Sequence, residues 1–299
     1  MNNGETPLLQ LKELNKHFKL NGGALLHAVD GINLDIYEGE TIGVVGESGC
    51  GKSTLGRTVL RLIEPTSGKI IYKGEDITQI SQRKFRPFRQ DLQMIFQDPM
   101  SSLNERAKVD YIISEGLYNF HAYKNEKERK EKVAAAMHSV GLLEEYATRF
   151  PHEFSGGQRQ RIGIARALAV EPRFIIADEP IRAQVINLLN RLKNEKGFTY
   201  MFIAHDLSVV RFISDRIAVM YKGRVVELAE TGELFRNPLH PYTNALLQAA
   251  PVPDPDIERD KEVLVYDPSV HHYESEKPYW SEVRPGHFVW ANDPELAEY

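Results

Sequence analysis

The chain has 299 residues, 42% of them hydrophobic and 26% charged, which is enough for one large or two smaller globular domains. Its net charge of -5 gives no basic field that would favour nucleic acid as a partner. A single cysteine, Cys50, excludes an internal disulfide framework and fits a reducing compartment. The N-terminal residues lack the pattern of a signal peptide, and no stretch approaches the roughly 18 apolar residues of a membrane span. We therefore expect any role at a membrane to depend on a partner.

The first part of the chain reads as a group of strands that leads into a strand–loop–helix unit. Residues 8 to 45 alternate apolar and polar around turn signals, and the β-branched run 41–46 predicts a buried strand. From Ser53 apolar residues recur with helical spacing until Pro65, and 68–77 reads as a hairpin. Residues 100 to 150 lose strand character and carry charge-rich helical patterns, which predicts an inserted helical subdomain.

An alternation of helices and strands resumes near residue 155. The pattern predicts a helix over 157–169, a strand over 173–178, a helix over 182–195 and a strand over 199–204. Beyond about residue 235 Pro, Tyr and Asp become frequent, and we expect an irregular tail. We interpret the adjacent His271 and His272 of that tail as solvated surface residues.

The segment "GESGCGKST" (46–54) matches G-x-x-x-x-G-K-[ST] and lies between a predicted buried strand and a predicted helix, the context that the motif requires. Glycines let such a loop fold into a nest of N–H groups for phosphate, and the following helix adds the positive end of its dipole. Lys52 is then expected to reach the β- and γ-phosphates of a nucleotide, and the Ser53 hydroxyl to bind Mg²⁺. The alternative is a glycine-rich turn with an incidental lysine. Such a loop could lower the thiol pKa of Cys50, but a small residue tolerated in a turn is the preferred interpretation.

Two carboxylates, Asp178 and Glu179, follow an apolar strand directly. Parallel sheets bind ligands at the carboxyl edge, so Asp178 suits a magnesium shell there. Glu179 would lie on the γ-phosphate side, placed to orient or deprotonate an attacking water. The alternative is a helix N-terminus with acids that favour its dipole.

Three further stretches carry candidate polar groups. "SGGQ" (155–158) reads as a capping box, but two glycines in a first helical turn favour an exposed helix start that could bind phosphate. Gln97 follows a predicted strand and could touch the metal or its water. His205 ends another predicted buried strand; a lone histidine is more often structural, although this position raises the expectation of a role.

With these motifs in this order, residues 8 to 235 resemble the ATP-binding subunits of ABC transporters. The resemblance implies a P-loop NTPase (RecA-like) α/β core with an N-terminal antiparallel β subdomain and an inserted helical subdomain. It implies that Phe18 stacks on adenine, that Gln97 forms the Q-loop, that Asp178 and Glu179 are the Walker B acid and catalytic base, and that His205 is the switch histidine. The Walker A loop would comprise Gly46, Glu47, Ser48, Gly49, Cys50, Gly51, Lys52, Ser53 and Thr54. The signature that grips ATP held by the opposite subunit would comprise Ser155, Gly156, Gly157 and Gln158.

The resemblance also implies cofactors, partners and a division of the chain. ATP and Mg²⁺ are the implied cofactors, with Ser53, Gln97 and Asp178 as metal ligands. Residues 1–97 and 159–235 would form the β subdomain and nucleotide-binding core, and 98–158 the helical subdomain that docks on membrane subunits. Residues 236–299 are similar to the C-terminal extension of oligopeptide and dipeptide importers, and their end to the F-type subunit of Gram-positive bacteria. The implied partners are a second, related ATP-binding subunit, two membrane permeases and, indirectly, an extracytoplasmic peptide-binding protein, with no nucleic acid. The implied location is the cytoplasmic face of a bacterial membrane.

One segment departs from the family pattern. Family members follow D-E-P with a short D-loop containing S-A-L-D, whereas this chain passes from Pro180 through Ile181 to Arg182, so about seven residues are absent. Because the D-loop helps set water and base geometry, we hypothesise intact ATP binding with impaired hydrolysis. A deletion in the source sequence is equally compatible. The alternatives are a catalytically weak nucleotide-binding partner of a heterodimeric transporter ATPase, and a soluble ABC protein acting on ribosomes or DNA.

Overall fold

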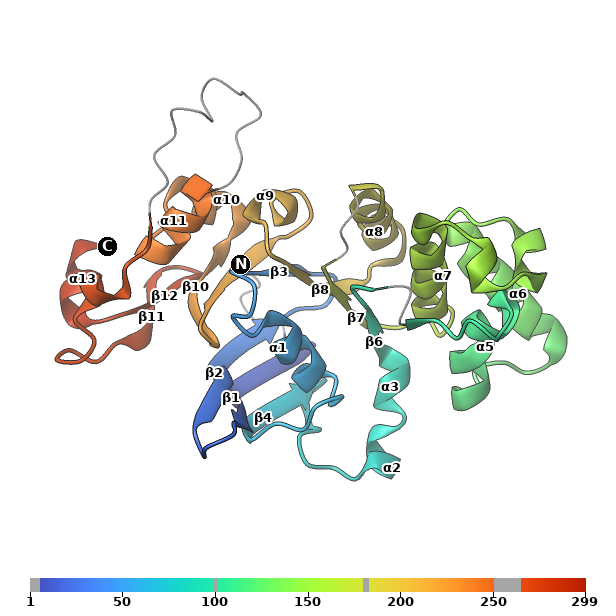
Figure 1. Ribbon diagram of the computed structural model, residues 1–299, viewed down its shortest axis with the longest axis horizontal. Coiled ribbons are helices and arrows are strands. Elements are labelled where there is room, and N and C mark those ends of the chain that lie inside the picture. The colour runs from blue at the N-terminus through green and yellow to red at the C-terminus, as the bar shows by residue number, and fades with distance from the viewer. Residues whose placement is uncertain (1–5, 99–101, 180–182, 250–264) are drawn as a thin grey trace, which may run out of the picture. The chain divides into compact units, whose positions relative to one another are not determined.

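The computed structural model describes residues 6–98, 102–179, 183–249 and 265–299 (Figure 1). The chain separates into two compact units, one formed by Met1–Thr78 with Phe202–Tyr299 and the other by Gln79–Met201. Strand β8 (Thr199–Ala204), which coincides with the predicted strand 199–204, spans the boundary between them. The finer division at residues 97, 158 and 235 stays a prediction.

The first unit contains a small antiparallel sheet near the N-terminus. Its strand order is β2 (Leu25–Ile36), β1 (Leu9–Lys19), β4 (Ser67–Tyr72) and β5 (Glu75–Asp76). Strand β1 pairs antiparallel with both neighbours, for example Leu11 with Leu34 of β2 and with Ile70 of β4. All three side chains are buried. The antiparallel β subdomain and the hairpin over 68–77 are confirmed.

The first unit also contains part of a larger mixed sheet, in which the strand over 41–45 is fully buried. The strand order is β11 (Tyr279–Arg284), β12 (His287–Ala291), β10 (Arg224–Glu230), β9 (Arg216–Tyr221) and β3 (Thr41–Val45). β3 runs parallel to β9, and the other pairs in this series are antiparallel. Every residue of β3 is buried, as its continuous apolar sequence predicts for a strand covered on both faces. The helices of this unit are α1 (Lys52–Val59), α9 (Leu207–Val210), α10 (Thr231–Arg236), α11 (Pro241–Ala249), η3 (Pro268–His271) and α13 (Asp293–Glu298).

The second unit combines a parallel strand pair with packed helices. Strands β6 (Leu92–Ile95) and β7 (Phe174–Asp178) pair in parallel, with Met94 opposite Ile176. Helices α5 (Val109–Phe120), α6 (Glu126–Ser139) and α7 (Gly156–Leu168) contact one another, as expected for a helical subdomain. Arg129 of α6 is buried and donates to Asp110 (2.9 Å) and Ser114 (2.6 Å) of α5. The remaining elements are α2 (Gln82–Phe85), α3 (Phe88–Asp91), η1 (Glu144–Thr148), η2 (Pro151–Glu153) and α8 (Ala183–Lys196).

The expectation of an irregular tail after residue 235 is wrong. Helix α11, the hairpin β11–β12 and the capped helix α13 lie there. The surface interpretation also fails for His271, which is 2% exposed, pairs with Glu295 and stacks on Tyr273, whereas His272 is exposed. Polar side chains of this region form hydrogen bonds and ion pairs with one another, so a polar sequence can still build an ordered core.

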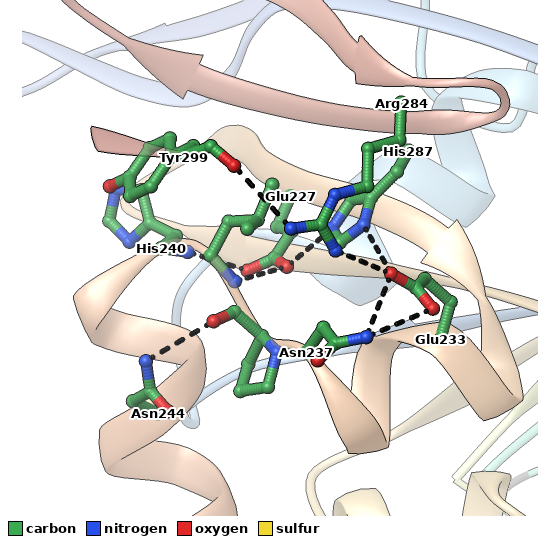
Figure 2. Close-up of polar contacts among 10 residues, drawn as sticks. Glu227, Glu233, Asn237, His240, Asn244, Arg284, His287 and Tyr299 are labelled. Carbon is green, nitrogen blue, oxygen red and sulfur yellow. Dashed lines mark hydrogen bonds and ion pairs between the residues drawn. The ribbon is translucent and has the colours of Figure 1, made fainter. Parts of the chain in front are cut away.

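A buried carboxylate joins the parts of this C-terminal region (Figure 2). Glu227 of β10 is 0% exposed and accepts hydrogen bonds from the backbone N–H groups of Leu239 and His240, both at 2.9 Å. Its Oε1 also lies 2.8 Å from Nε2 of His287 on β12. One side chain therefore holds both the start of α11 and the C-terminal hairpin.

We expect Glu227→Ala to lower the free energy of unfolding by about 2 to 5 kcal/mol, because it leaves two buried N–H groups without an acceptor. Chemical denaturation monitored by circular dichroism measures the change. Glu274→Ala, at an exposed position of the same region, is the control and should unfold like the parent chain. Equal stability of the two variants would contradict the anchoring role.

Stability should also fall with acidification. Burial, with the nearby His271 adding to it, lowers the pKa of His240 to about 3. The unfolded chain, with an ordinary histidine pKa near 6.5, therefore binds the proton first, and stability is lost as pH falls from about 6.5 towards 3, by at most about 1.4 kcal/mol per pH unit.

His240→Asn should flatten this pH dependence, because asparagine does not titrate. The fold should tolerate the change, since the amide oxygen can still accept from the Tyr242 N–H, which lies 3.1 Å from Nδ1 of His240. Denaturation curves between pH 4.5 and 7.5 test this, with the exposed His272→Asn as control. A slope in His240→Asn equal to that of the parent chain would exclude His240 as its source.

Candidate functional site

The predicted phosphate loop lies between β3 and α1, in the strand–loop–helix arrangement that the motif requires. Helix α1 begins at Lys52, and its N-cap, Gly51, has φ 110°. Gly46 and Gly49 also have positive φ, at 151° and 80°. The backbone therefore turns through conformations that residues other than glycine rarely adopt.

Close backbone packing explains two of these glycines. A Cβ atom on Gly51 would lie 1.9 Å from the carbonyl oxygen of Ala28, and one on Gly46 would lie 2.1 Å from that of Met220. A Cβ on Gly49 would meet no atom within 4 Å. The loop therefore packs closely against β2 at Gly51 and against β9 at Gly46.

Lys52 folds back across the loop that precedes it. Its side chain is 4% exposed, and Nζ donates to the carbonyl oxygens of Gly46 (2.8 Å) and Glu47 (2.9 Å). Burial raises the pKa of the Cys50 thiol, although the charge of Lys52 acts in the opposite direction. The alternative of a lowered thiol pKa is therefore wrong. Cys50 is a buried neutral thiol.

The acid pair ends a buried strand, as predicted. Asp178 is the last residue of β7 and is 1% exposed. Glu179 follows with φ 43°, an uncommon conformation for a residue with a side chain. Gln97, beyond the end of the neighbouring strand β6, donates from Nε2 to Glu179 Oε2 at 2.7 Å. The structure thus brings together two of the predicted catalytic side chains, and their roles stay predictions. The short connection through 180–182 lies outside the described residues.

The predicted capping box at the start of α7 is confirmed. Ser155 is the N-cap and its Oγ accepts from the Gln158 N–H at 3.4 Å, while Gln158 Oε1 accepts from the Ser155 N–H at 3.0 Å. Ser155 and Gly156 are exposed and Gly157 is half-buried. The first turn of this helix is accessible, which a ligand-binding helix start requires.

The two remaining candidates, Phe18 and His205, both lie in the first unit. Phe18 is half-buried on β1, with Lys16 Nζ 4.9 Å from its ring centroid. His205 is exposed between β8 and α9, next to Asp206, which caps α9. The phosphate loop shares this unit, whereas Gln97, 155–158 and the acid pair belong to the second.

Tyr242 contacts the phosphate loop, although no sequence motif marks it as a site residue. The hydroxyl of Tyr242 accepts a hydrogen bond from the Glu47 N–H at 3.0 Å, across 195 residues of sequence. No local motif could have revealed this contact, since it depends on where α11 packs.

We expect Gly51→Ala to abolish nucleotide binding by the loop or weaken it by more than tenfold, because the added Cβ collides with a backbone carbonyl. Gly49→Ala is the matched control, since it has positive φ but open space, and should cost about 1 kcal/mol of stability. Titration with a fluorescent nucleotide and thermal unfolding measure both effects. Equal behaviour of the two variants would show that the close contact is not limiting.

Two segments of the chain match models of known protein families. Residues 29–182 match the family described as "ABC transporter", and residues 226–280 match "Oligopeptide/dipeptide transporter, C-terminal region". The chain is 58% identical to the oligopeptide transport ATP-binding protein AmiF of Streptococcus pneumoniae, over 98% of this chain and 97% of that protein. It is 54% identical to OppF of Bacillus subtilis, over 98% of each.

Solved structures agree with the sequence relatives. The ATP-binding cassette MJ0796 bound to ADP and Pi superposes with a TM-score of 0.68 at 29% identity, covering 75% of this chain and 98% of that one. The cbiO1 subunit of Clostridium perfringens gives the same TM-score at 31% identity, covering 78% of this chain and 92% of that one. The phosphate loop, the acid-ended strand and the two family matches lead to one conclusion: the chain belongs to the ABC transporter family.

Proposed function

We propose that this chain is an ATP-binding and ATP-hydrolysing subunit that energises an ABC importer for oligopeptides or dipeptides. The observation that carries the proposal is the phosphate loop, in which Lys52 is held over the backbone between a buried strand and a helix start. The match of residues 226–280 and the relatives named as oligopeptide transport ATP-binding proteins support the substrate class.

The chemistry of the donors fits a magnesium–nucleotide ligand. Asp178, Gln97 and Ser53 offer a carboxylate, an amide oxygen and a hydroxyl, the hard oxygen ligands that Mg²⁺ prefers. Mg²⁺, when bound, neutralises charge on the phosphates. Lys52 would direct its ammonium group at phosphate oxygens, and the loop N–H groups would surround them. Phe18 would stack on the adenine ring.

Glu179 is the proposed base for the attacking water, with Gln97 holding one of its carboxylate oxygens. The hydrogen bond fixes the direction of the carboxylate, which matters because proton transfer needs the base within hydrogen-bond reach of the water. His205 would act as a second polar contact in the hydrolytic state. The accessible start of α7 (155–158) is suited to ATP held by an opposite subunit.

The short segment after Glu179 leads us to propose that hydrolysis is impaired. In the sequence, Pro180, Ile181 and Arg182 alone separate Glu179 from Ala183, the first residue of α8. The second candidate function, a catalytically weak subunit that binds nucleotide and completes a heterodimer, rests on the same observation.

The proposed partners are a second, related ATP-binding subunit and two membrane permeases, with a peptide-binding protein acting indirectly. Among the described residues, no helix has both the length and the apolar character needed to cross a bilayer. We propose that the permeases hold the chain at the cytoplasmic face of the membrane through the helical subdomain.

We expect insertion of a seven-residue D-loop containing S-A-L-D after Pro180 to raise ATP turnover by tenfold or more, because loop geometry positions water and base. Steady-state phosphate release, measured with the partner subunits present, tests this. Glu179→Gln in both backgrounds is the control and should abolish turnover while leaving nucleotide affinity within about twofold. Equal turnover with and without the insertion would refute the impairment.

A further inference from the structure

A hydrogen bond joins the phosphate loop to the C-terminal extension (residues 236–299). The Tyr242 hydroxyl accepts from the backbone N–H of Glu47, which directly follows Gly46 in the loop. Tyr242 is 1% exposed, and burial raises its pKa, so its hydroxyl stays neutral. We propose that Tyr242 is a positioning residue for the phosphate loop, through which the C-terminal extension sets nucleotide affinity.

Hydrogen bonds hold the phosphate loop at several points. Lys52 Nζ donates hydrogen bonds to the carbonyl oxygens of Gly46 and Glu47, and the Gly223 N–H donates to the Cys50 carbonyl at 2.8 Å. The Cys50 N–H donates within the loop, to the Glu47 carbonyl at 3.3 Å, whereas the Glu47 N–H donates to the Tyr242 hydroxyl, which comes from outside the loop. Loss of that acceptor leaves a part-buried N–H unpaired, a state that folded proteins avoid.

Tyr242 is itself held in place by its neighbours. Its ring packs on Tyr221 with centroids 4.6 Å apart, and its own N–H donates to Nδ1 of His240 at 3.1 Å. The His240 N–H in turn donates to the buried Glu227, which also lies 2.8 Å from His287 of the C-terminal hairpin (Figure 2). A continuous series of contacts within the first unit thus runs from the hairpin to the loop.

The phosphate loop would bind its ligand through backbone N–H groups. Its inner side is suited to phosphate, so small displacements of its backbone weaken several hydrogen bonds at once. A hydrogen bond from the loop backbone to a buried side chain reduces those displacements. This inference rests on the proposed function in one respect, the identity of the ligand as a nucleotide.

The test is Tyr242→Phe, which keeps the ring and removes only the acceptor. Without nucleotide, hydrogen exchange of the peptide that contains residues 46–49 should quicken by about tenfold at the Glu47 amide, as expected for loss of one hydrogen bond. The dissociation constant for a fluorescent Mg-nucleotide should rise by about five- to tenfold. The melting temperature should fall by only about 2 to 4 °C, since a single part-buried N–H loses its acceptor.

Tyr266→Phe is the matched control, because the Tyr266 ring packs against Tyr242 with centroids 5.3 Å apart. It should leave loop exchange and nucleotide affinity at the values of the parent chain. Unchanged exchange and affinity in Tyr242→Phe would overturn the proposal, and so would equal changes in both variants, which would indicate packing alone. A parent chain that binds no Mg-nucleotide would refute the proposed function, while the exchange measurement would still decide the role of Tyr242.

Discussion

The phosphate loop packs so closely against two neighbouring strands that its backbone has little freedom to move. Gly51 and Gly46 lie so near the carbonyls of Ala28 and Met220 that a single methyl group would not fit. The loop shape is therefore set by β2 and β9 as much as by its own sequence. Lys52 and Tyr242 complete this arrangement, Lys52 by donating to a loop carbonyl and Tyr242 by accepting from a loop N–H.

Local patterns predicted those elements whose conformation depends on neighbours in sequence. The buried strand 41–46, the helix over 157–169 and the strand over 199–204 correspond to β3, α7 and β8 within a residue or so. The capping box at Ser155 also follows from spacing alone. These features succeed because burial and capping are both properties of a short stretch of chain.

Contacts between distant residues could not be predicted in this way. The ordered tail depends on Glu227, which holds backbone groups 12 and 13 residues later and an imidazole 60 residues later. The pairing of His271 with Glu295 and the Tyr242–Glu47 bond have the same origin. At the site, the residue types were predictable from motifs, whereas the Gln97–Glu179 contact required knowledge that β6 and β7 are neighbours.

The place of the C-terminal hairpin beside β10 bears on solubility. Five of the seven residues of β10 are buried, and β12 covers the side of that strand away from β9. Without the hairpin, β10 would present unpaired backbone groups and apolar side chains at an open sheet edge, the kind of surface on which proteins aggregate. Strand β11 ends the sheet instead, with Glu282 and Arg284 among its half-buried and exposed residues, and such charges oppose edge-to-edge association.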